Sequence, residues 1–307
     1  MVQQEYSCSI LLSIDEMEPP RRPRRVLRYA LPPLALVGGL GALELLRQRY
    51  QARRVFRPER FPQGEWTPEK LGLPIEDLWF EAEDGVRLHG WWISHPEAEG
   101  TLLYCHGQTG SIAHRVDLLK KLAGYRANIF AFDYRGYGRS RGAPSEKGLF
   151  RDVRAAHDVI TGELGQSSER IVLIGQSLGG AVAIDGALNR PVAGLVVQSS
   201  FLDIKSMARS SHPRLPVHWI ARNQFKSADK VPHLAMPKLF IHGTADRVVP
   251  FHHGRGLFEK AAWPKQFYAV PGAGHTDVLD RGGVTYFWRL SRFLLSCVKP
   301  HAGPEEA

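Results

Sequence analysis

The sequence is poor in cysteine, and beyond its first 60 residues it lacks the concentrated basic stripe of a nucleic-acid binder. Its three cysteines, Cys8, Cys105 and Cys297, provide neither a disulfide framework nor the spacing of a metal site. The net charge of +9 is concentrated near the start, where residues 1–60 hold 11 arginines and 6 acidic residues. Because the remainder is only weakly basic, we expect no nucleic-acid partner. No motif calls for a metal or an organic cofactor.

The beginning of the chain has the composition of a membrane segment. Residues 1–28 are polar and arginine-rich and are expected to be disordered, whereas the 18 residues of 29–46 are apolar except for Glu44. That length is at the short end of what spans a bilayer. We therefore predict a single-pass membrane protein, with an interfacial helix, a signal sequence or an N-terminal packing helix as alternatives. Arginines on both sides of the segment leave its orientation undetermined.

The rest of the chain divides into a linker over 47–75, a large folded domain over 76–298 and a tail over 299–307. A hydrophobic content of 43% is ample for a large core. Strand patterns alternate with helix patterns, after an initial hairpin with an Asp84-Gly85 turn. This alternation predicts an α/β fold with a mostly parallel sheet covered on both faces. The expected strands are 78–82, 86–93, 101–106, 128–132, 170–174, 193–198, 238–242 and 266–270, and the expected helices are 110–123, 146–164, 178–189, 253–262 and 282–297.

The most informative motif is a serine between glycines at a strand-to-helix turn. An apolar strand runs into Gly175-Gln176-Ser177-Leu178-Gly179, and a helix of small residues follows. Such a turn is too tight for side chains two positions on either side of the serine, which explains the two glycines. A serine presented in this way is typically a nucleophile, so Ser177 is the candidate catalytic residue.

Two further strand ends carry the residues that a serine nucleophile needs. In a parallel sheet, functional groups gather at the carboxyl ends of the strands. Asp246 follows the strand 238–242, and His275 follows the strand 266–270. A histidine can take the serine proton, and a buried carboxylate can orient that histidine. Asp203, after the strand 193–198, is the alternative acid, although an N-cap role for the helix that follows it is favoured.

An oxyanion hole requires two main-chain N–H groups near the nucleophile. Leu178, directly after Ser177, is expected to supply one of them. The other is expected from Gln108, in the loop His106-Gly107-Gln108-Thr109-Gly110 that follows the strand 101–106. His106 could serve as a second base, but support of this turn is the favoured interpretation.

These residues resemble the α/β-hydrolase superfamily over about 76–298. The stretch from Phe132 to Gly142, reading FDYRGYGRSRG, and the pentapeptide HGTAD that ends at Asp246 are similar to the serine-aminopeptidase-like branch of α/β-hydrolase-domain proteins. That branch includes membrane-anchored serine hydrolases and protein depalmitoylases. The resemblance implies an eight-stranded, mostly parallel sheet, helices on both faces and a small cap, here over 202–236. Depalmitoylases attach through an N-terminal cysteine cluster, whereas this chain has Cys8 alone.

The sequence thus predicts a membrane-tethered serine hydrolase that cleaves carboxylic ester or thioester bonds of a small-molecule or lipid acyl substrate. Peptidase, amidase or acyltransferase activity would use the same Ser177, His275 and Asp246. A non-catalytic, membrane-bound interaction module that retains the fold is the alternative from another class. The oligomeric state is not predicted.

Overall fold

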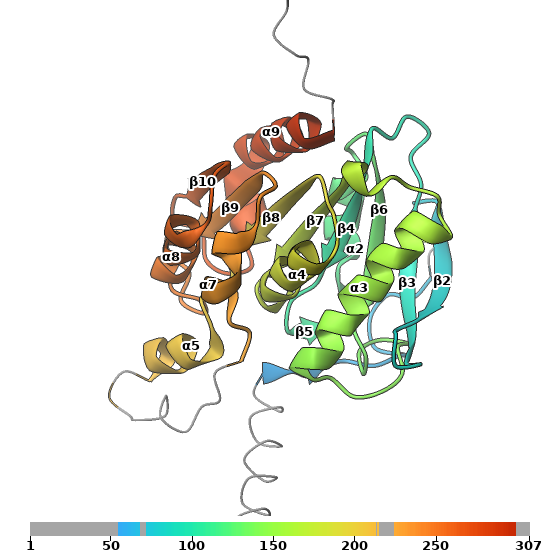
Figure 1. The fold of residues 1–307 in the computed structure, drawn as a ribbon, viewed down its shortest axis with the longest axis horizontal. Helices are drawn as coiled ribbons and strands as arrows, with labels where there is room; N and C mark the ends of the chain where they lie inside the picture. The colour runs from blue at the N-terminus through green and yellow to red at the C-terminus, as the bar shows by residue number, and fades with distance from the viewer. Residues whose placement is uncertain (1–54, 68–71, 213, 215–223, 299–307) are drawn as a thin grey trace, which may run out of the picture. The chain divides into compact units, whose positions relative to one another are not determined.

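The computed structural model describes residues 55–67, 72–212, 214 and 224–298 (Figure 1). Its centre is an eight-stranded sheet with the strand order β10-β9-β8-β7-β4-β6-β3-β2. The β2–β3 and β3–β6 pairs are antiparallel, and every other neighbouring pair is parallel. The strands are β2 (Ile75–Glu81), β3 (Arg87–Ile93), β4 (Gly100–Cys105), β6 (Ala127–Asp133), β7 (Ile171–Gln176), β8 (Gly194–Gln198), β9 (Lys238–Gly243) and β10 (Lys265–Val270).

Alternating apolar side chains build a core on each face of the sheet. In β4, Leu103 and Cys105 belong to one hydrophobic cluster, whereas Leu102 and Tyr104 belong to the other. This two-sided burial explains the nearly continuous apolar sequence of the central strands. The first face is covered by α3 (Glu146–Gly162), α4 (Leu178–Asn189) and α8 (Phe251–Lys260), and the second by α2 (Val116–Leu122) and α9 (Val278–Val298).

The predicted fold class is confirmed: the sheet has eight strands, is mostly parallel and has helices on both faces. The Asp84-Gly85 turn joins β2 and β3, with Gly85 at a φ of +73° that favours glycine. The helix predicted over 178–189 has those bounds in the structure. The last helix begins earlier than predicted, at Val278, and Gly283 interrupts it with a φ of +48°.

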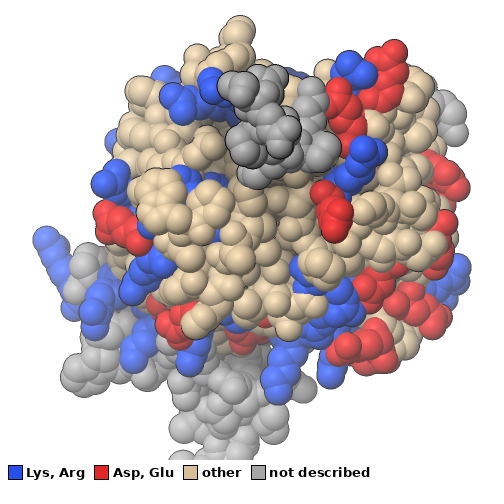
Figure 2. Space-filling model, turned by 45° about the horizontal axis from the view of Figure 1, so that its top comes forward, with Lys and Arg blue, Asp and Glu red and all other residues tan. Residues whose placement is uncertain are grey.

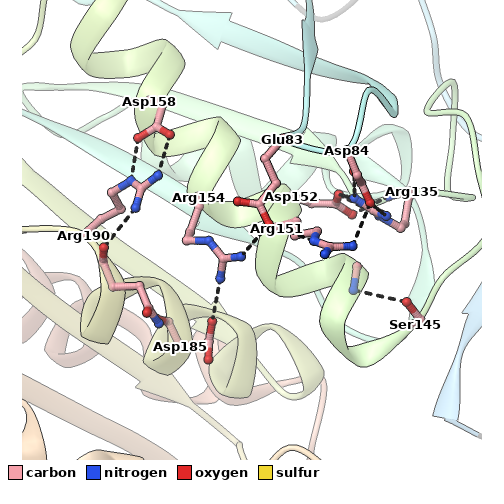
Figure 3. A network of polar contacts seen from close by, with 12 residues as sticks. Glu83, Asp84, Arg135, Ser145, Arg151, Asp152, Arg154, Asp158, Asp185 and Arg190 are labelled. Atoms are coloured by element: carbon pink, nitrogen blue, oxygen red, sulfur yellow. Dashed lines mark hydrogen bonds and ion pairs between the residues drawn. The ribbon is translucent and has the colours of Figure 1, made fainter.

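Salt bridges fasten α3 to its neighbours (Figure 3). Arg135 reaches Asp84 of the β2–β3 turn at 2.8 Å and Asp152 of α3 at 2.7 Å. Further along α3, Arg154 contacts Asp185 of α4 at 3.5 Å. These contacts join the hairpin, the loop after β6 and two helices on one face of the sheet.

A short segment outside the main sheet crosses to the loop after β4. β1 (Arg57–Pro58) pairs in parallel with β5 (Thr109–Gly110), which lies in the predicted oxyanion loop. We call residues 56–66 the strap. Its Phe56 and Trp66 are buried, and Arg60 donates to the main-chain oxygens of Gly136 and Gly142. The sequence placed these residues in a linker, because main-chain pairing of this kind leaves no side-chain pattern.

The insert after β8 holds the region predicted as a small cap. It contains α5 (Ile204–Ser211), α7 (Ser227–Lys230) and the 3₁₀ helix η4 (Val231–His233), and residues 213 and 215–223 lie outside the described part. Asp203 caps α5 by accepting from the Ser206 N–H at 2.8 Å. The N-cap interpretation of Asp203 is therefore confirmed.

Among the described residues, no helix has both the length and the apolar character needed to cross a membrane. This finding overturns the predicted single-pass membrane localisation. The 21-residue α9 is long enough to span a bilayer, but it carries Asp280, Arg281, Arg289 and Arg292. Residues 29–46, on which the prediction was based, lie outside the described residues.

Charged side chains of both signs occur on the face drawn in Figure 2. Lysines, arginines and acidic residues are interspersed around an uncharged central area. The described residues on this face therefore form no single basic stripe of the kind that follows a nucleic-acid backbone.

Candidate active site

Ser177 sits on a strained turn between β7 and α4. Its φ of +55° and ψ of −116° lie in a region that residues other than glycine rarely adopt. A side chain on Gly179 would overlap the main-chain oxygens of Cys105 and His106 in β4 and its loop, and one on Gly175 would overlap the start of α4. The two glycines thus let the helix begin close against the sheet, which raises Ser177 at the carboxyl edge.

His275 and Asp246 meet Ser177 at this edge. The Nε2 atom of His275 lies 3.1 Å from the Ser177 Oγ, and its Nδ1 lies 2.8 Å from the Asp246 Oδ2. Since an ionised carboxylate only accepts, the proton of a neutral His275 belongs on Nδ1, and Nε2 is left to accept from the serine hydroxyl. The Asp246 side chain is fully buried and that of His275 is 14% exposed.

Asp246 is held as an anion by several donors. Its Oδ1 accepts from the N–H groups of Val248 at 2.9 Å and Val249 at 2.8 Å. Burial alone would raise the pKa of Asp246, but the nearby imidazoles of His242 and His275 and the Val249 N–H outweigh it and hold that pKa well below its usual range. An ionised carboxylate is the state needed to orient His275 and to stabilise its protonated form.

His242 is a site residue that sequence reasoning missed. It lies near the end of β9, and its Nε2 donates to the Val249 carbonyl at 2.8 Å while lying 3.4 Å from the Asp246 Oδ2. A side chain on Gly254 would overlap the His242 ring, so this glycine gives the imidazole its space. The available signal was its position four residues before Asp246 at a strand end.

The predicted oxyanion loop passes beside the nucleophile. A Cβ added to Gly107 would lie 3.7 Å from the Ser177 Cβ, so the loop backbone and the serine are neighbours. Leu178 is the first residue of α4, directly after Ser177. The structure therefore brings the Gln108 loop, Leu178 and Ser177 to one place.

His106 supports this loop through a hydrogen bond to the loop's main chain. Its buried ring donates from Nδ1 to the Gly107 carbonyl at 2.8 Å, and its Nε2 faces the Asp133 Oδ1 at 3.7 Å. Burial, aided by the positive charge of Arg115, lowers the pKa of His106 to about 3. A neutral, turn-supporting imidazole agrees with the favoured interpretation from the sequence.

Around Asp133, three buried polar atoms have no hydrogen-bond partner in the described part of the chain, and one of them is its own Oδ2. These atoms are the His89 Nδ1, the Asp133 Oδ2 and the His106 Nε2. Burial raises the pKa of Asp133 to about 7, although the Ile112 N–H, which donates to Oδ1 at 2.9 Å, opposes the shift. The interior next to this loop thus holds the Asp133 carboxyl group, which keeps its proton at a higher pH than an exposed carboxyl group does.

The residues described here do not include any group of three His, Cys, Asp or Glu side chains placed to hold a metal ion. Asp203, the alternative acid, is engaged as the cap of α5, where both of its carboxylate oxygens accept from Ser206. The residue that contacts His275 is therefore Asp246.

Fold and site together define a class of protein. A strained serine at a strand-to-helix turn of a mostly parallel sheet, followed along the chain by an aspartate and a histidine at later strand ends, is the arrangement of the α/β hydrolases.

Comparison with known proteins gives the family. The family described as serine aminopeptidase, S33, matches residues 96–229. The alpha/beta hydrolase domain-containing protein WAV2 of Arabidopsis thaliana is 34% identical over 261 residues, which cover 78% of this chain and 84% of that protein. The uncharacterized protein Rv2307c of Mycobacterium tuberculosis is 34% identical over 269 residues, or 86% of this chain and 95% of that protein. The chain belongs to the α/β-hydrolase superfamily and is a hydrolase.

Solved structures agree on the fold. The esterase Pf2001 of Pyrococcus furiosus superposes with a TM-score of 0.68 at 22% identity, covering 79% of this chain and 100% of that one. The family match includes Ser177 but ends before Asp246 and His275. The roles of those two residues therefore depend on the geometry at the carboxyl edge.

Proposed function

We propose that the protein is a serine hydrolase that cleaves carboxylic ester or thioester bonds. The observation that carries this proposal is the continuous hydrogen-bonded series from the Ser177 hydroxyl through His275 to the buried Asp246. Nucleophile, base and orienting acid are within the distances that proton transfer requires.

In the proposed reaction, the Ser177 Oγ attacks the acyl carbon while its proton passes to the His275 Nε2. The carbonyl electrons move onto oxygen, and the main-chain N–H groups of Leu178 and Gln108 stabilise that charge. Collapse of this intermediate expels the alcohol or thiol, which takes the proton from His275. Water then attacks the acyl enzyme with His275 again as base, and the products are a carboxylic acid and free Ser177.

The substrate is proposed to be an acyl ester or thioester of a small molecule or a lipid. Esterases among the proteins with a similar fold, such as Pf2001, support ester chemistry for this scaffold. The triad itself does not select an acyl chain length, so substrate profiling is part of the test.

The test combines a covalent probe with kinetics on the full chain. We expect a fluorophosphonate probe to label the wild type and to leave Ser177→Ala unlabelled, because the probe forms a bond only with an activated nucleophile. Hydrolysis of p-nitrophenyl esters and matched thioesters of increasing chain length gives the preferred substrate. A folded wild type that neither reacts with the probe nor hydrolyses any ester or thioester would contradict the proposal, as would equal labelling of Ser177→Ala.

A further inference from the structure

The main chain on both sides of Gln108 is fixed by hydrogen bonds to its carbonyl groups. In the peptide before it, the Gly107 oxygen accepts from the His106 Nδ1 at 2.8 Å. In the peptide after it, the Gln108 oxygen accepts from the Arg57 N–H at 3.2 Å and from the Tyr137 hydroxyl at 2.9 Å. The peptide groups before and after Gln108 are thus both fixed by hydrogen bonds.

Anchoring a carbonyl also aims the N–H of the same peptide. A trans peptide is planar, and its C=O and N–H groups point in opposite directions. The His106 contact therefore sets the plane that contains the Gln108 N–H. The contacts to the Gln108 oxygen fix the next peptide plane, which limits rotation of the chain at the Gln108 Cα. An oxyanion hole depends on this preorganisation, because a donor that must reorient during the reaction loses much of its effect.

Two of these three donors come from outside the loop itself. Arg57 belongs to the strap, and Tyr137 belongs to the loop after β6. Strap and loop also hold each other: the Gly138 N–H donates to the Glu59 oxygen at 2.9 Å, and the Phe61 N–H donates to the Gly138 oxygen at 3.0 Å. The strap and the loop after β6, which supply the two donors to Gln108, are therefore hydrogen-bonded to each other.

The strap also packs against the insert after β8. Its Phe56 ring lies edge-on against Phe225 with the ring centroids 6.1 Å apart, and both side chains are buried. Phe225 in turn packs edge-on against Phe150 of α3 at 5.5 Å. The packing of Phe56 against Phe225 thus fixes the main chain at Arg57, whose N–H donates to the Gln108 carbonyl.

We propose that Arg57 and Tyr137 are positioning residues of the oxyanion hole, and that the strap is a working part of the active site. The Arg57 N–H and the Tyr137 hydroxyl share the Gln108 carbonyl and thereby fix the peptide after Gln108. With that peptide fixed, the preceding one, whose Gln108 N–H meets the developing negative charge, is held at both of its ends. Neither residue touches the reacting atoms. This inference rests on the proposed serine-hydrolase function.

The test uses substitutions that remove single donors from the full chain. Tyr137→Phe removes the hydroxyl, and Arg57→Pro removes the main-chain N–H, whereas Arg57→Ala removes only the side chain. We expect Tyr137→Phe and Arg57→Pro each to lower kcat by about tenfold with KM nearly unchanged. The double variant should lose about 10²-fold, which is the effect of losing an oxyanion donor. Arg57→Pro should be about tenfold slower than Arg57→Ala.

A transition-state analogue separates positioning from a general structural role. A trifluoromethyl ketone that carries the preferred acyl chain adds to Ser177 and forms an oxyanion, whereas the matching methyl carbinol does not. We expect the two variants to lose affinity for the ketone by the same factor as kcat and to bind the carbinol like the wild type. Tyr125→Phe is the matched control, since it removes a tyrosine hydroxyl that donates to the Phe287 carbonyl at 3.2 Å, remote from the loop.

Each outcome decides the proposal. Unchanged kcat and ketone affinity in Tyr137→Phe would overturn it, as would equal losses for ketone and carbinol. If Arg57→Pro fails to fold, Tyr137→Phe still gives the answer. A wild type that hydrolyses esters, with an inactive Ser177→Ala and an unaffected Tyr137→Phe, would leave the serine-hydrolase function standing and remove only the positioning role. An unreactive wild type would overturn both.

Discussion

Individual residues at the site combine strain, burial and charge, each with a visible cause. Ser177 has a positive φ in a turn where glycines at 175 and 179 let α4 begin close against the sheet. Asp246 stays ionised although buried, since two main-chain donors and two imidazoles surround it. The Ser177 hydroxyl is thus held in a costly backbone conformation, and His275 links it to the buried charge of Asp246.

The strain at Ser177 predicts a stability difference between two inactive variants. Ser177→Ala keeps a Cβ at a φ of +55°, whereas Ser177→Gly removes it. We expect the glycine variant to be the more stable by about 1 kcal/mol, because a left-handed conformation costs non-glycine residues about that much. Urea unfolding of both proteins measures the difference. An alanine variant as stable as the glycine variant would mean that the turn stores no strain.

The carboxylate at 246 predicts a large kinetic effect. In Asp246→Asn, the amide favours the tautomer of His275 that has its proton on Nε2, which cannot accept from Ser177. We expect kcat to fall by about 10³- to 10⁴-fold, as measured with p-nitrophenyl ester.

The control is the other candidate acid. Asp203→Ala loses a helix cap, which costs about 1 kcal/mol of folding stability, and should keep kcat near that of the wild type. If Asp203→Ala lost more activity than Asp246→Asn, the assignment of the acid would have to be reversed.

Elements of secondary structure place these residues, chiefly through the close approach of α4 to the sheet. Glycines at 175, 179 and 180 let the first turn of α4 lie against β4 and β8. On the outer side, salt bridges link α3 with α4 and the β2–β3 turn (Figure 3). The helix that follows the nucleophile is therefore fixed from both sides.

This close approach predicts that one glycine cannot be replaced while another can. Gly179→Ala would press a methyl group into the Cys105 carbonyl, so we expect a loss of about 2–3 kcal/mol or more in the free energy of unfolding. Gly162→Ala, in the exposed last turn of α3 with open space around it, should instead stabilise by about 0.5–1 kcal/mol. Thermal or urea unfolding measures both. Equal stability of the two variants would contradict the packing described for α4.

The sequence predicts elements well where local chemistry and long-range packing agree. The helix at 178–189 follows a glycine turn and is rich in small residues, and its predicted and observed bounds coincide. The strap was missed because Arg57 and Thr109 pair through main-chain atoms that any side chain would allow. His242 was missed because its place four residues before Asp246 does not by itself show that the chain turns after β9 and brings the two side chains within 3.4 Å. The predicted start of the last helix, at 282, is four residues later than the observed one, because the pair Gly282-Gly283 is typical of a helix end.

For the molecule as a whole, buried carboxyl groups should govern how stability changes with pH. The pKa of Asp133 in the folded state, about 7, lies above the ordinary value of 3.8. The folded protein therefore binds one more proton than the unfolded chain between these values. Stability from this group is complete below pH 3.8 and is lost as the pH rises toward about 7.

Replacing Asp133 by asparagine should remove this pH dependence. The amide oxygen can still accept from the Ile112 N–H at the position of Oδ1. The amide nitrogen then takes the position of Oδ2, 4.0 Å from the His89 Nδ1, which has no hydrogen-bond partner within the described structure. We expect Asp133→Asn to be more stable than the wild type at pH 8, on the order of 2 kcal/mol, with a smaller difference at pH 5. Urea unfolding at both values is the measurement. An advantage that is the same at pH 5 and pH 8 would show that Asp133 does not titrate between them.

The distance along the chain between nucleophile and base has a consequence for biosynthesis. Ser177 and His275 are 98 residues apart, and the base follows the last strand of the sheet. At about 5–20 residues per second, a ribosome needs roughly 5–20 s to add that stretch. A nascent chain can therefore contain Ser177 for several seconds before His275 is added. Under the proposed function, a chain released before His275 has been added would lack the general base and would be inactive.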